Sequence, residues 1–304
     1  MYRNFVAKSP QMLDILSVIN KIAPTTSPVI IYGENGVGKS LVAEQIHLKS
    51  LRRNEAFIRV NCFSNSEQTL EIELFGDESN SNQNNEQGYL KLASNGTIFF
   101  EEIGYLPLRL QNKLLLYIQT NECNVRIIAS TSLDLESRVN DGSFLKELYY
   151  RLCVLPLNIP ALRNRKDDIE SLSMYFCEIF SNKTKKLFTG FSQNALKMMY
   201  DYYWTGNVRE LKNAIERACI LGQPPLIQSS DLRLNVANSD ELLQIQYNES
   251  ETDKNLKSAV QKFKKTYVVQ ILDSVSWNQT EASKIMGIQR TYLSKLMSDL
   301  DIRK

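Results

Sequence analysis

The sequence predicts an α/β fold, in which a parallel sheet is wrapped by helices on both faces and two smaller helical units follow. Strand-like apolar runs alternate with helical stretches through the first half of the 304-residue chain, and such alternation favours a parallel sheet. After about residue 166 the strand signals fade and helical spacing takes over. The composition is that of a globular protein, since 43% of the residues are hydrophobic and 23% are charged.

The first unit is expected over residues 1–166. Ser9 and Pro10 suit the cap and first position of a helix, and apolar residues at helical spacing follow them. Parallel strands share their carboxyl ends at one edge of a sheet, where ligands bind in open α/β folds. Five strands are expected, at Val29–Tyr32, Phe57–Val60, Thr97–Phe100, Val125–Ala129 and Val154–Ile159.

A phosphate-binding loop of the pattern G-x-x-x-x-G-K-[ST] joins the first strand to the next helix. Its glycines allow backbone N–H groups to turn toward a phosphate, and the helix N-terminus adds partial positive charge. Lys39 is expected to reach the outer phosphates and Ser40 to ligate Mg²⁺. We therefore expect ATP or ADP to bind at Gly33, Glu34, Asn35, Gly36, Val37, Gly38, Lys39, Ser40 and Leu41.

The third expected strand runs into two acids, Glu101 and Glu102. An apolar strand that ends in acids, downstream of a phosphate loop, is typical of carboxylates that hold Mg²⁺ and polarise the attacking water. We expect Glu101 to join Ser40 as a metal ligand, and Glu102 to act on the water.

Other site classes are not expected. The five cysteines are scattered singly and the chain has one histidine, which argues against a zinc site and a disulfide framework. No stretch approaches the roughly 20 apolar residues that span a membrane, and the N-terminus has no signal-peptide pattern. A cytoplasmic protein without membrane contact is expected.

Three further units are expected after the sheet. Residues 167–222 form a small helical lid, residues 223–255 a polar linker, and residues 256–304 a helix-turn-helix with its turn at Gly287. The last unit has nine basic and four acidic residues, a net charge of +5. A solvated basic face on a three-helix bundle would have the same charge, but the helix spacing favours double-stranded DNA. The expected contacts are Gln289, Arg290, Thr291, Tyr292, Ser294 and Lys295.

With these motifs in this order, the chain resembles the bacterial enhancer-binding proteins, the AAA+ activators of sigma-54 RNA polymerase. The resemblance covers about residues 5–222, and the C-terminal unit resembles the Fis-type helix-turn-helix of the same family. The matching stretches are GENGVGKS, FIRVNC, ELFG, GTIFFEEIG, VRIIASTSLDL, ELYYRL, PALRNRKDDI, WTGNVREL and NQTEASKIMGIQRTYLSKL.

The resemblance implies further roles. Asn61 would position the catalytic glutamate, Arg151 would be an arginine finger offered to the neighbouring subunit's nucleotide, and Arg209 would be the sensor arginine of the lid. It also implies DNA, the RNA polymerase holoenzyme and other copies of the chain as partners. The homo-oligomer is expected to range from a dimer to a hexamer or heptamer.

The chain departs from the family pattern at four places. Residues 77–87 follow ELFG where activators of sigma-54 polymerase carry a GAFTGA loop, and they contain no aromatic residue, threonine or glycine. Glu101 replaces an aspartate, Ser132 an asparagine, and Leu145 a second finger arginine. Since a finger can contribute 10³ or more in rate, we expect ATP to bind with hydrolysis weak or absent.

Three functions fit this sequence. The first is a DNA-binding regulator that acts with the housekeeping RNA polymerase rather than with sigma-54. The second is an active ATPase that remodels a transcription complex. The third is a transcription factor that responds to a cyclic dinucleotide, for which the basic stretch at residues 163–166 offers phosphate contacts, although a solvated lid junction also explains that stretch.

Overall fold

The structure is a computed structural model, and it describes residues 5–63, 66–76, 88–120, 124–234, 265, 268–269, 271–272, 275, 277–300 and 302. The chain divides into two compact units, residues 1–236 and 237–304. The stretch without a GAFTGA loop, and most of the first helix expected in the C-terminal unit, lie outside the described residues.

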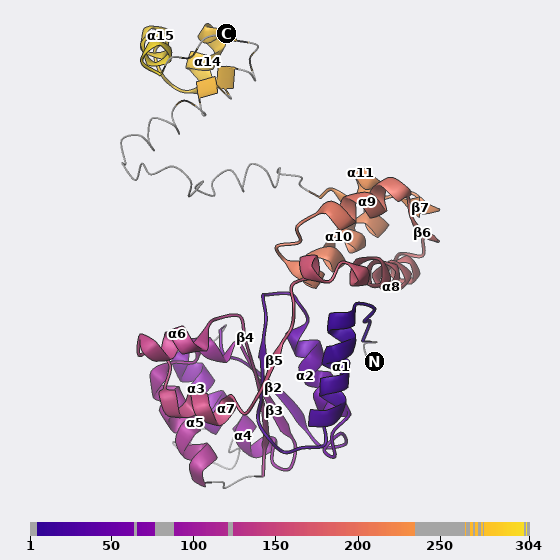
Figure 1. Cartoon of the computed structure of the whole chain (residues 1–304), viewed down its shortest axis with the longest axis vertical. Helices are drawn as coiled ribbons and strands as arrows, with labels where there is room; N and C mark the ends of the chain where they lie inside the picture. The colour runs from indigo at the N-terminus through magenta and orange to yellow at the C-terminus, as the bar shows by residue number, and fades with distance from the viewer. Residues whose placement is uncertain are drawn as a thin grey trace. The chain divides into compact units, whose positions relative to one another are not determined.

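The first unit is built on a five-stranded parallel sheet of order β2-β3-β4-β1-β5 (Figure 1). This confirms the α/β fold, and each observed strand lies within two residues of its expected bounds. The apolar runs of the three central strands are buried on both faces, which is why they predicted these strands well, whereas the two edge strands are partly exposed. The strands are Val29–Tyr32 (β1), Phe57–Asn61 (β2), Thr97–Glu101 (β3), Arg126–Thr131 (β4) and Leu155–Asn158 (β5).

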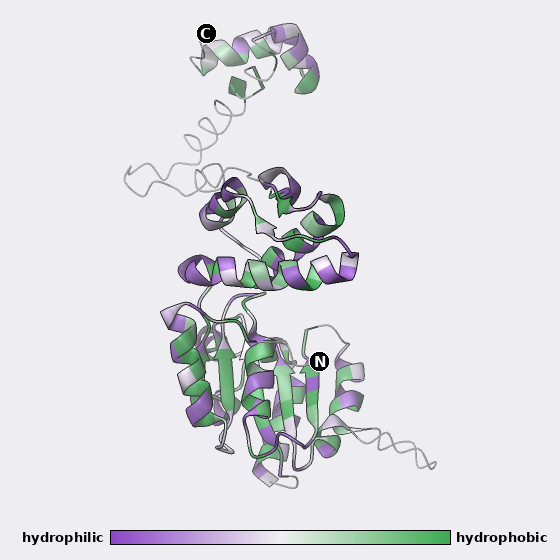
Figure 2. Cartoon of the chain, turned by 90° about the vertical axis from the view of Figure 1, so that its right-hand side faces the viewer, coloured by the Kyte–Doolittle hydropathy of each residue, from purple (hydrophilic) through white to green (hydrophobic). Residues whose placement is uncertain are grey.

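Helices cover both faces of this sheet (Figure 1). Successive side chains of a strand point to opposite faces, so Phe100 packs in one core cluster and Phe99 in the other. Figure 2 shows the strands as mostly hydrophobic ribbons between more polar helices. One face carries α1 (Pro10–Ile22) and α2 (Lys39–Leu48), and the other carries α3 (Glu67–Phe75), α4 (Tyr89–Leu92), α5 (Leu108–Thr120), α6 (Leu135–Asn140) and α7 (Lys146–Leu152).

Helix α1 begins and ends with side-chain caps. The Ser9 hydroxyl accepts a hydrogen bond from the Met12 N–H at 3.4 Å, which confirms the predicted cap. At the other end, the buried Arg126 donates to the Ala23 and Ile22 carbonyls at 2.5 and 2.9 Å. A cation at a helix C-terminus satisfies otherwise unpaired carbonyls and opposes the helix dipole.

The helical lid is the second layer of the same unit. Its core surrounds Trp204, which is fully buried and donates its indole N–H to the Met199 carbonyl at 2.8 Å. Ile227 and Leu232, which the sequence analysis assigned to the linker, are buried in this core. The lid comprises α8 (Asp167–Thr184), α9 (Gln193–Asp201), α10 (Asn207–Leu221), α11 (Ser229–Leu232) and the paired strands β6 (Gly190–Phe191) and β7 (Leu226–Ile227).

The second unit contains the two expected short helices, α14 (Gln279–Ile285) and α15 (Arg290–Asp299). Gly287 between them has a φ of 64°, a backbone angle that glycine adopts without steric cost. Leu272, Ala282 and Leu293 are buried together, so the helices share a small core. No helix of the described residues has the length and apolar composition that a membrane span requires.

Candidate nucleotide site

The phosphate loop leaves β1 and opens helix α2. Gly36 and Gly38 have φ angles of 81° and 109°, which side chains rarely tolerate. A Cβ built at Gly38 would meet no described atom within 4 Å, so the loop borders open space there. The Lys39 side chain is 8% exposed, and its Nζ donates to the Gly33 and Glu34 carbonyls at 2.6 and 3.2 Å. These contacts fix the lysine across the loop.

The two acids meet this loop at the carboxyl ends of the strands. The Ser40 hydroxyl donates to Glu101 Oε1 at 2.5 Å, so the longer glutamate still reaches the serine that it was expected to accompany. Glu102 Oε1 lies 2.8 Å from Lys39 Nζ. The structure therefore brings Lys39, Ser40, Glu101 and Glu102 together, as the sequence predicted.

Ser132 makes a contact with Glu102 that was not predicted from the sequence. Its backbone N–H and its hydroxyl both donate to Glu102 Oε2 at 2.8 Å. Ser132 directly follows β4, which lies beside β3 in the sheet, so strand order was the signal that could have paired it with Glu102. With Lys39 on the other oxygen, both carboxylate oxygens of Glu102 have protein partners.

The residues present suit Mg²⁺. Ser40 and Glu101 offer hard oxygen ligands side by side, which Mg²⁺ prefers. In the part of the chain that the structure describes, no group of three or more His, Cys, Asp or Glu side chains could hold a metal. A site with two protein oxygens fits an ion that keeps several waters and takes the rest of its ligands from substrate phosphates.

Asn61 is exposed at the end of β2 and lies in register with Glu101. Its Oδ1 accepts a hydrogen bond from the Phe63 N–H at 3.0 Å. This places Asn61 beside the acids at the carboxyl ends of the strands, while its amide oxygen is hydrogen-bonded to the turn that follows β2.

The lid lies directly on the phosphate loop. The Arg209 N–H donates to the Gly36 carbonyl at 3.3 Å, and a Cβ at Gly36 would come within 2.3 Å of the Gly206 carbonyl. Glycine is therefore required at position 36 by close approach as well as by its backbone angle. Arg209 itself is exposed at the edge of the loop.

Asn207 is the buried centre of this contact. It is fully buried, and its Nδ2 donates to Glu34 Oε2 at 3.0 Å and to the Asn35 carbonyl at 3.1 Å. Its Oδ1 accepts from the Leu162 N–H at 2.8 Å. One amide thus joins the phosphate loop, the end of the core and the first turn of α10.

Two arginines of the basic stretch 163–166 complete the junction. Arg163 pairs with Glu34, and this contact holds the pKa of that carboxyl at about 2, below its usual 4.5. Arg165 is 4% exposed and donates to the Val37 carbonyl at 2.7 Å. The stretch is therefore a lid junction, as expected. Arg165 was expected to be solvated there, but it is buried.

A buried carboxylate of α8 ties the N-terminal segment to the lid. Asp168 is fully buried and accepts hydrogen bonds from the Lys8 N–H, the Ser9 N–H and the Ser9 hydroxyl at 2.6, 2.7 and 2.8 Å. Arg165 lies 3.8 Å from it. Three hydrogen bonds and a nearby cation satisfy the desolvated charge.

Helix α7 carries the finger candidate. Arg151 is exposed in its last turn, whereas Leu145 is half-buried at its N-terminus, where its N–H donates to Gln111 Oε1 at 2.8 Å. Leu145 is therefore a packing residue of the core.

On α15 the six residues expected to contact DNA are all exposed, including Tyr292 at 53%. Leu293 is buried against the rest of the unit, and the Ser294 hydroxyl donates to Gln279 at 3.5 Å. The polar face of α15 is thus available to solvent.

Comparison with known proteins identifies the same family that the sequence motifs resemble. The Sigma-54 interaction domain matches residues 5–158, and the AAA+ ATPase lid domain matches residues 163–249. The chain belongs to the sigma-54 interaction domain family. This confirms the resemblance to the enhancer-binding proteins, which are transcriptional regulators with an AAA+ ATPase domain.

Two curated relatives illustrate the match to this family. The regulatory protein AtoC of Escherichia coli K12 is 35% identical, over 98% of this chain and 68% of that protein. A protein described as uncharacterized, encoded in the HyuA 5′ region of Pseudomonas sp. NS671, is 36% identical over 93% of this chain and 99% of its own length.

Among solved structures, NtrX from Brucella abortus in complex with ADP has a TM-score of 0.73 and 29% sequence identity, over 98% of this chain and 69% of that chain. NtrX in complex with ATP also has a TM-score of 0.73, with 28% identity over 99% of this chain and 70% of that chain. These complexes support nucleotide binding by a fold of this kind.

Proposed function

We propose that the protein is a DNA-binding transcription regulator of the cytoplasm that uses ATP mainly as an assembly and conformational ligand, with weak or absent hydrolysis. The observation that carries this proposal is the contact between Ser132 and Glu102, in which Oε2 accepts hydrogen bonds from both the backbone N–H and the hydroxyl of Ser132. A carboxylate oxygen that already accepts two hydrogen bonds has no lone pair left for an attacking water, so Glu102 could orient that water only through Oε1.

Binding of ATP requires contacts to its phosphates and to Mg²⁺, and the residues at the loop are suited to make them. Lys39, Ser40 and Arg209 would contact the phosphates, and Glu101 would join Ser40 on Mg²⁺. Bound Mg²⁺ would neutralise phosphate charge. Asn61 would lie near the outer phosphate, and Arg151 would reach the nucleotide of a neighbouring subunit. Because Leu145 offers no second finger cation, Arg151 would be the single arginine finger that a neighbouring subunit supplies to a transferring phosphoryl group. A ligand shared in this way stabilises the oligomer by mass action without being consumed.

An active remodelling ATPase is the second candidate. It is favoured by one contact, the hydrogen bond between Ser40 and Glu101, because the longer acid keeps its place beside the metal-binding hydroxyl.

Turnover and binding measured together separate the two candidates. ATP hydrolysis and ATP binding are measured on the purified protein at concentrations that allow oligomers, with Lys39→Ala as the control. Tight binding with turnover no higher than in Lys39→Ala supports the ligand role. Robust turnover that is lost in Lys39→Ala supports the remodelling ATPase and refutes the proposal that ATP is mainly an assembly ligand.

We also propose that its partner is the housekeeping RNA polymerase holoenzyme. Residues 77–87 contain no aromatic residue, threonine or glycine, so the segment cannot form the loop that presses on sigma-54. In transcription with purified components, activation or repression is expected with the housekeeping holoenzyme. Activation of the sigma-54 holoenzyme would refute this choice of partner.

The double-stranded DNA contact is assigned to the exposed face of α15. Arg290→Ala is expected to weaken operator binding by roughly tenfold, since a good base contact contributes about 1–3 kcal/mol. Lys284→Ala, on α14, is the matched control for lost charge. Equal weakening by both variants would mean that α15 does not read the sequence.

A further inference from the structure

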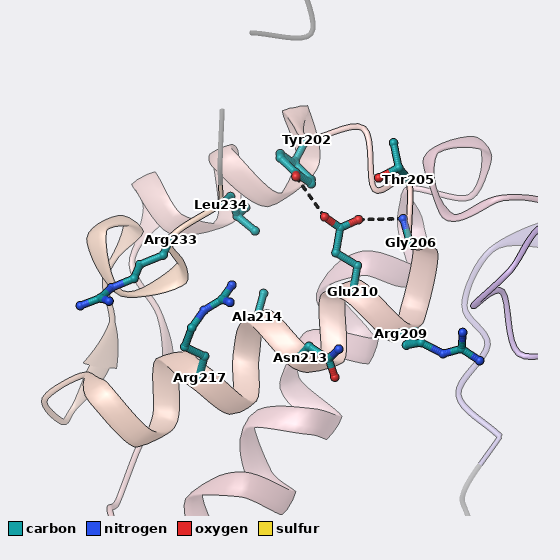
Figure 3. Close-up of a pocket in the computed structure, with 10 residues that line it drawn as sticks. All are labelled: Tyr202, Thr205, Gly206, Arg209, Glu210, Asn213, Ala214, Arg217, Arg233 and Leu234. Carbon is teal, nitrogen blue, oxygen red and sulfur yellow. Dashed lines mark hydrogen bonds between the residues drawn. The ribbon is translucent and has the colours of Figure 1, made fainter. Parts of the chain in front are cut away.

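A groove in the lid is lined, apart from Arg209, by residues that the proposed function does not use. It has a volume of about 660 Å³, and it is formed by one face of α10, the loop before that helix and the residues after α11 (Figure 3). Cavities of about 300–1,000 Å³ accommodate small-molecule ligands. No residue of the phosphate loop lines this groove, and Arg209, at one end of it, is the lining residue that the proposed function assigns to the nucleotide.

The groove carries an excess of positive charge. Arg209, Arg217 and Arg233 line it together with a single acid, Glu210. Both oxygens of Glu210 are used locally, because Oε1 accepts from the Tyr202 hydroxyl at 3.0 Å and Oε2 accepts from the Gly206 N–H at 2.8 Å (Figure 3). The acid therefore braces the loop before α10 and does not pair with the arginines.

Arg217 and Arg233 lie at the same end of the groove. Arg217 Nη2 donates to the carbonyl of Leu232 at 3.3 Å, which brings its guanidinium next to the residue that precedes Arg233. In the part of the chain that the structure describes, no carboxylate lies within ion-pair distance of Arg217 or Arg233. An anion bound at this end of the groove would be attracted by both charges and would meet no competing carboxylate.

The type of cation indicates the ligand. A guanidinium presents several N–H donors in a planar fork that matches the oxygens of a phosphate. Thr205 and Asn213 add polar groups to the wall, and Ala214 and Leu234 add apolar surface, as expected of a site for a phosphorylated organic molecule. We propose that this groove is a second anion site, which binds a small phosphorylated organic ligand through Arg217 and Arg233.

The position of the groove connects it to the lid contact. Arg209 lies at its opposite end, and its side chain extends away from Arg217 and Arg233 (Figure 3). Its backbone N–H donates to the Gly36 carbonyl at 3.3 Å. A ligand in the groove thus lies against the helix whose first turn touches the phosphate loop. The groove site is independent of how fast ATP is hydrolysed.

The test must exclude binding at the phosphate loop. Calorimetry is carried out on full-length Lys39→Ala, which lacks the phosphate-binding lysine, with cyclic di-GMP and with inorganic pyrophosphate as separate probes. Binding of cyclic di-GMP alone identifies a nucleotide site, and binding of both identifies a site for phosphate groups in general. If neither probe binds, the proposal is overturned.

Two double substitutions in the Lys39→Ala background locate the site. Arg217→Gln with Arg233→Gln is expected to weaken binding of the probe at least tenfold. Lys197→Gln with Lys212→Gln removes two charges from exposed lid positions that do not line the groove, and it is expected to leave the affinity unchanged. Equal affinities in the two double variants overturn the proposal.

A competition experiment with the unsubstituted Lys39 provides a second readout. The probe is titrated into protein saturated with ADP, and binding is expected to persist because Arg217 and Arg233 lie at the end of the groove away from Arg209, the lining residue assigned to the nucleotide. Complete displacement of the probe by ADP would place it in the nucleotide site and overturn the proposal. Failure of ADP to bind at all would contradict the proposed function instead.

Discussion

The buried amide of Asn207 offers a direct measure of how firmly the lid is attached to the phosphate loop. We predict that Asn207→Ala destabilises the first unit by about 4 kcal/mol, from three separate costs. Leu162 is fully buried, and its N–H would lose the hydrogen bond to Asn207 Oδ1, which costs about 2 kcal/mol. Loss of the hydrogen bonds to Glu34 and Asn35 costs about 1 kcal/mol more.

The third cost is conformational. Asn207 has a φ of 53°, a region that Asn visits more readily than Ala, and Ala there costs about 1 kcal/mol. Asn207→Gly removes the same hydrogen bonds without this strain, so it should be about 1 kcal/mol less destabilising than Asn207→Ala. The difference between the two variants separates the hydrogen bonds from the backbone angle.

The assay is urea unfolding followed by tryptophan fluorescence. Trp204 is fully buried in the lid core, and the chain has two tryptophans, so a Trp277→Phe background makes Trp204 the sole reporter. The free energy of unfolding is compared for Asn207, Asn207→Ala and Asn207→Gly in that background. If both substitutions change it by less than about 0.5 kcal/mol, the amide does not anchor the lid and our account of the junction is refuted.

Three further predictions concern the same site. Since the pKa of Glu34 is held at about 2, below its usual 4.5, by Arg163, its stabilisation is present above pH 4.5 and is lost as the pH falls toward 2. The full shift corresponds to about 3.4 kcal/mol, and screening of a side chain that is 44% exposed leaves about 1 kcal/mol, which Glu34→Gln should remove at neutral pH. Gly36→Ala should lower the unfolding free energy by about 2 kcal/mol more than Gly38→Ala, because only at position 36 would the Cβ overlap a backbone carbonyl, at 2.3 Å. Ser132→Asn should raise ATP turnover, because it removes the hydroxyl from Glu102 and supplies a longer amide.

Each of these has a decisive outcome. An acid unfolding curve that is identical for the protein and Glu34→Gln would show that the carboxylate contributes nothing. Equal unfolding free energies for the two glycine variants would mean that the lid does not rest on position 36. For Ser132, the control is Ser132→Ala, which removes the hydroxyl without adding an amide. Turnover in Ser132→Asn no higher than in Ser132→Ala would show that this residue does not limit hydrolysis.

The sequence predicted the structure correctly wherever that structure depends on residues close together in the chain. The strands followed from continuous apolar runs, the cap of α1 from Ser9 and Pro10, and the phosphate loop from its glycine spacing. Lys39, Ser40 and the two acids could be grouped because parallel strands place their carboxyl ends together.

The contacts between distant segments could not be predicted in the same way. Asn207 and Glu34 are 173 residues apart, and their hydrogen bond depends on how the lid is seated, which no local pattern encodes. The short helix α11 was missed for a different reason. Pro224 and Pro225 indicate the end of a helical unit, whereas the burial of Ile227 and Leu232 shows that the lid continues beyond them.

The hydrogen bonds on Asp168 have a mechanical consequence. The Lys8 N–H, the Ser9 N–H and the Ser9 hydroxyl all end on this one carboxylate of the lid. Ser9 also caps α1, which lies against the sheet. A force on the backbone before Lys8 would therefore reach the lid and the sheet at the same residue. A displacement of the segment before Ser9 is therefore expected to act on two helices at once. These are α1, which Ser9 caps, and α8, which begins one residue before Asp168.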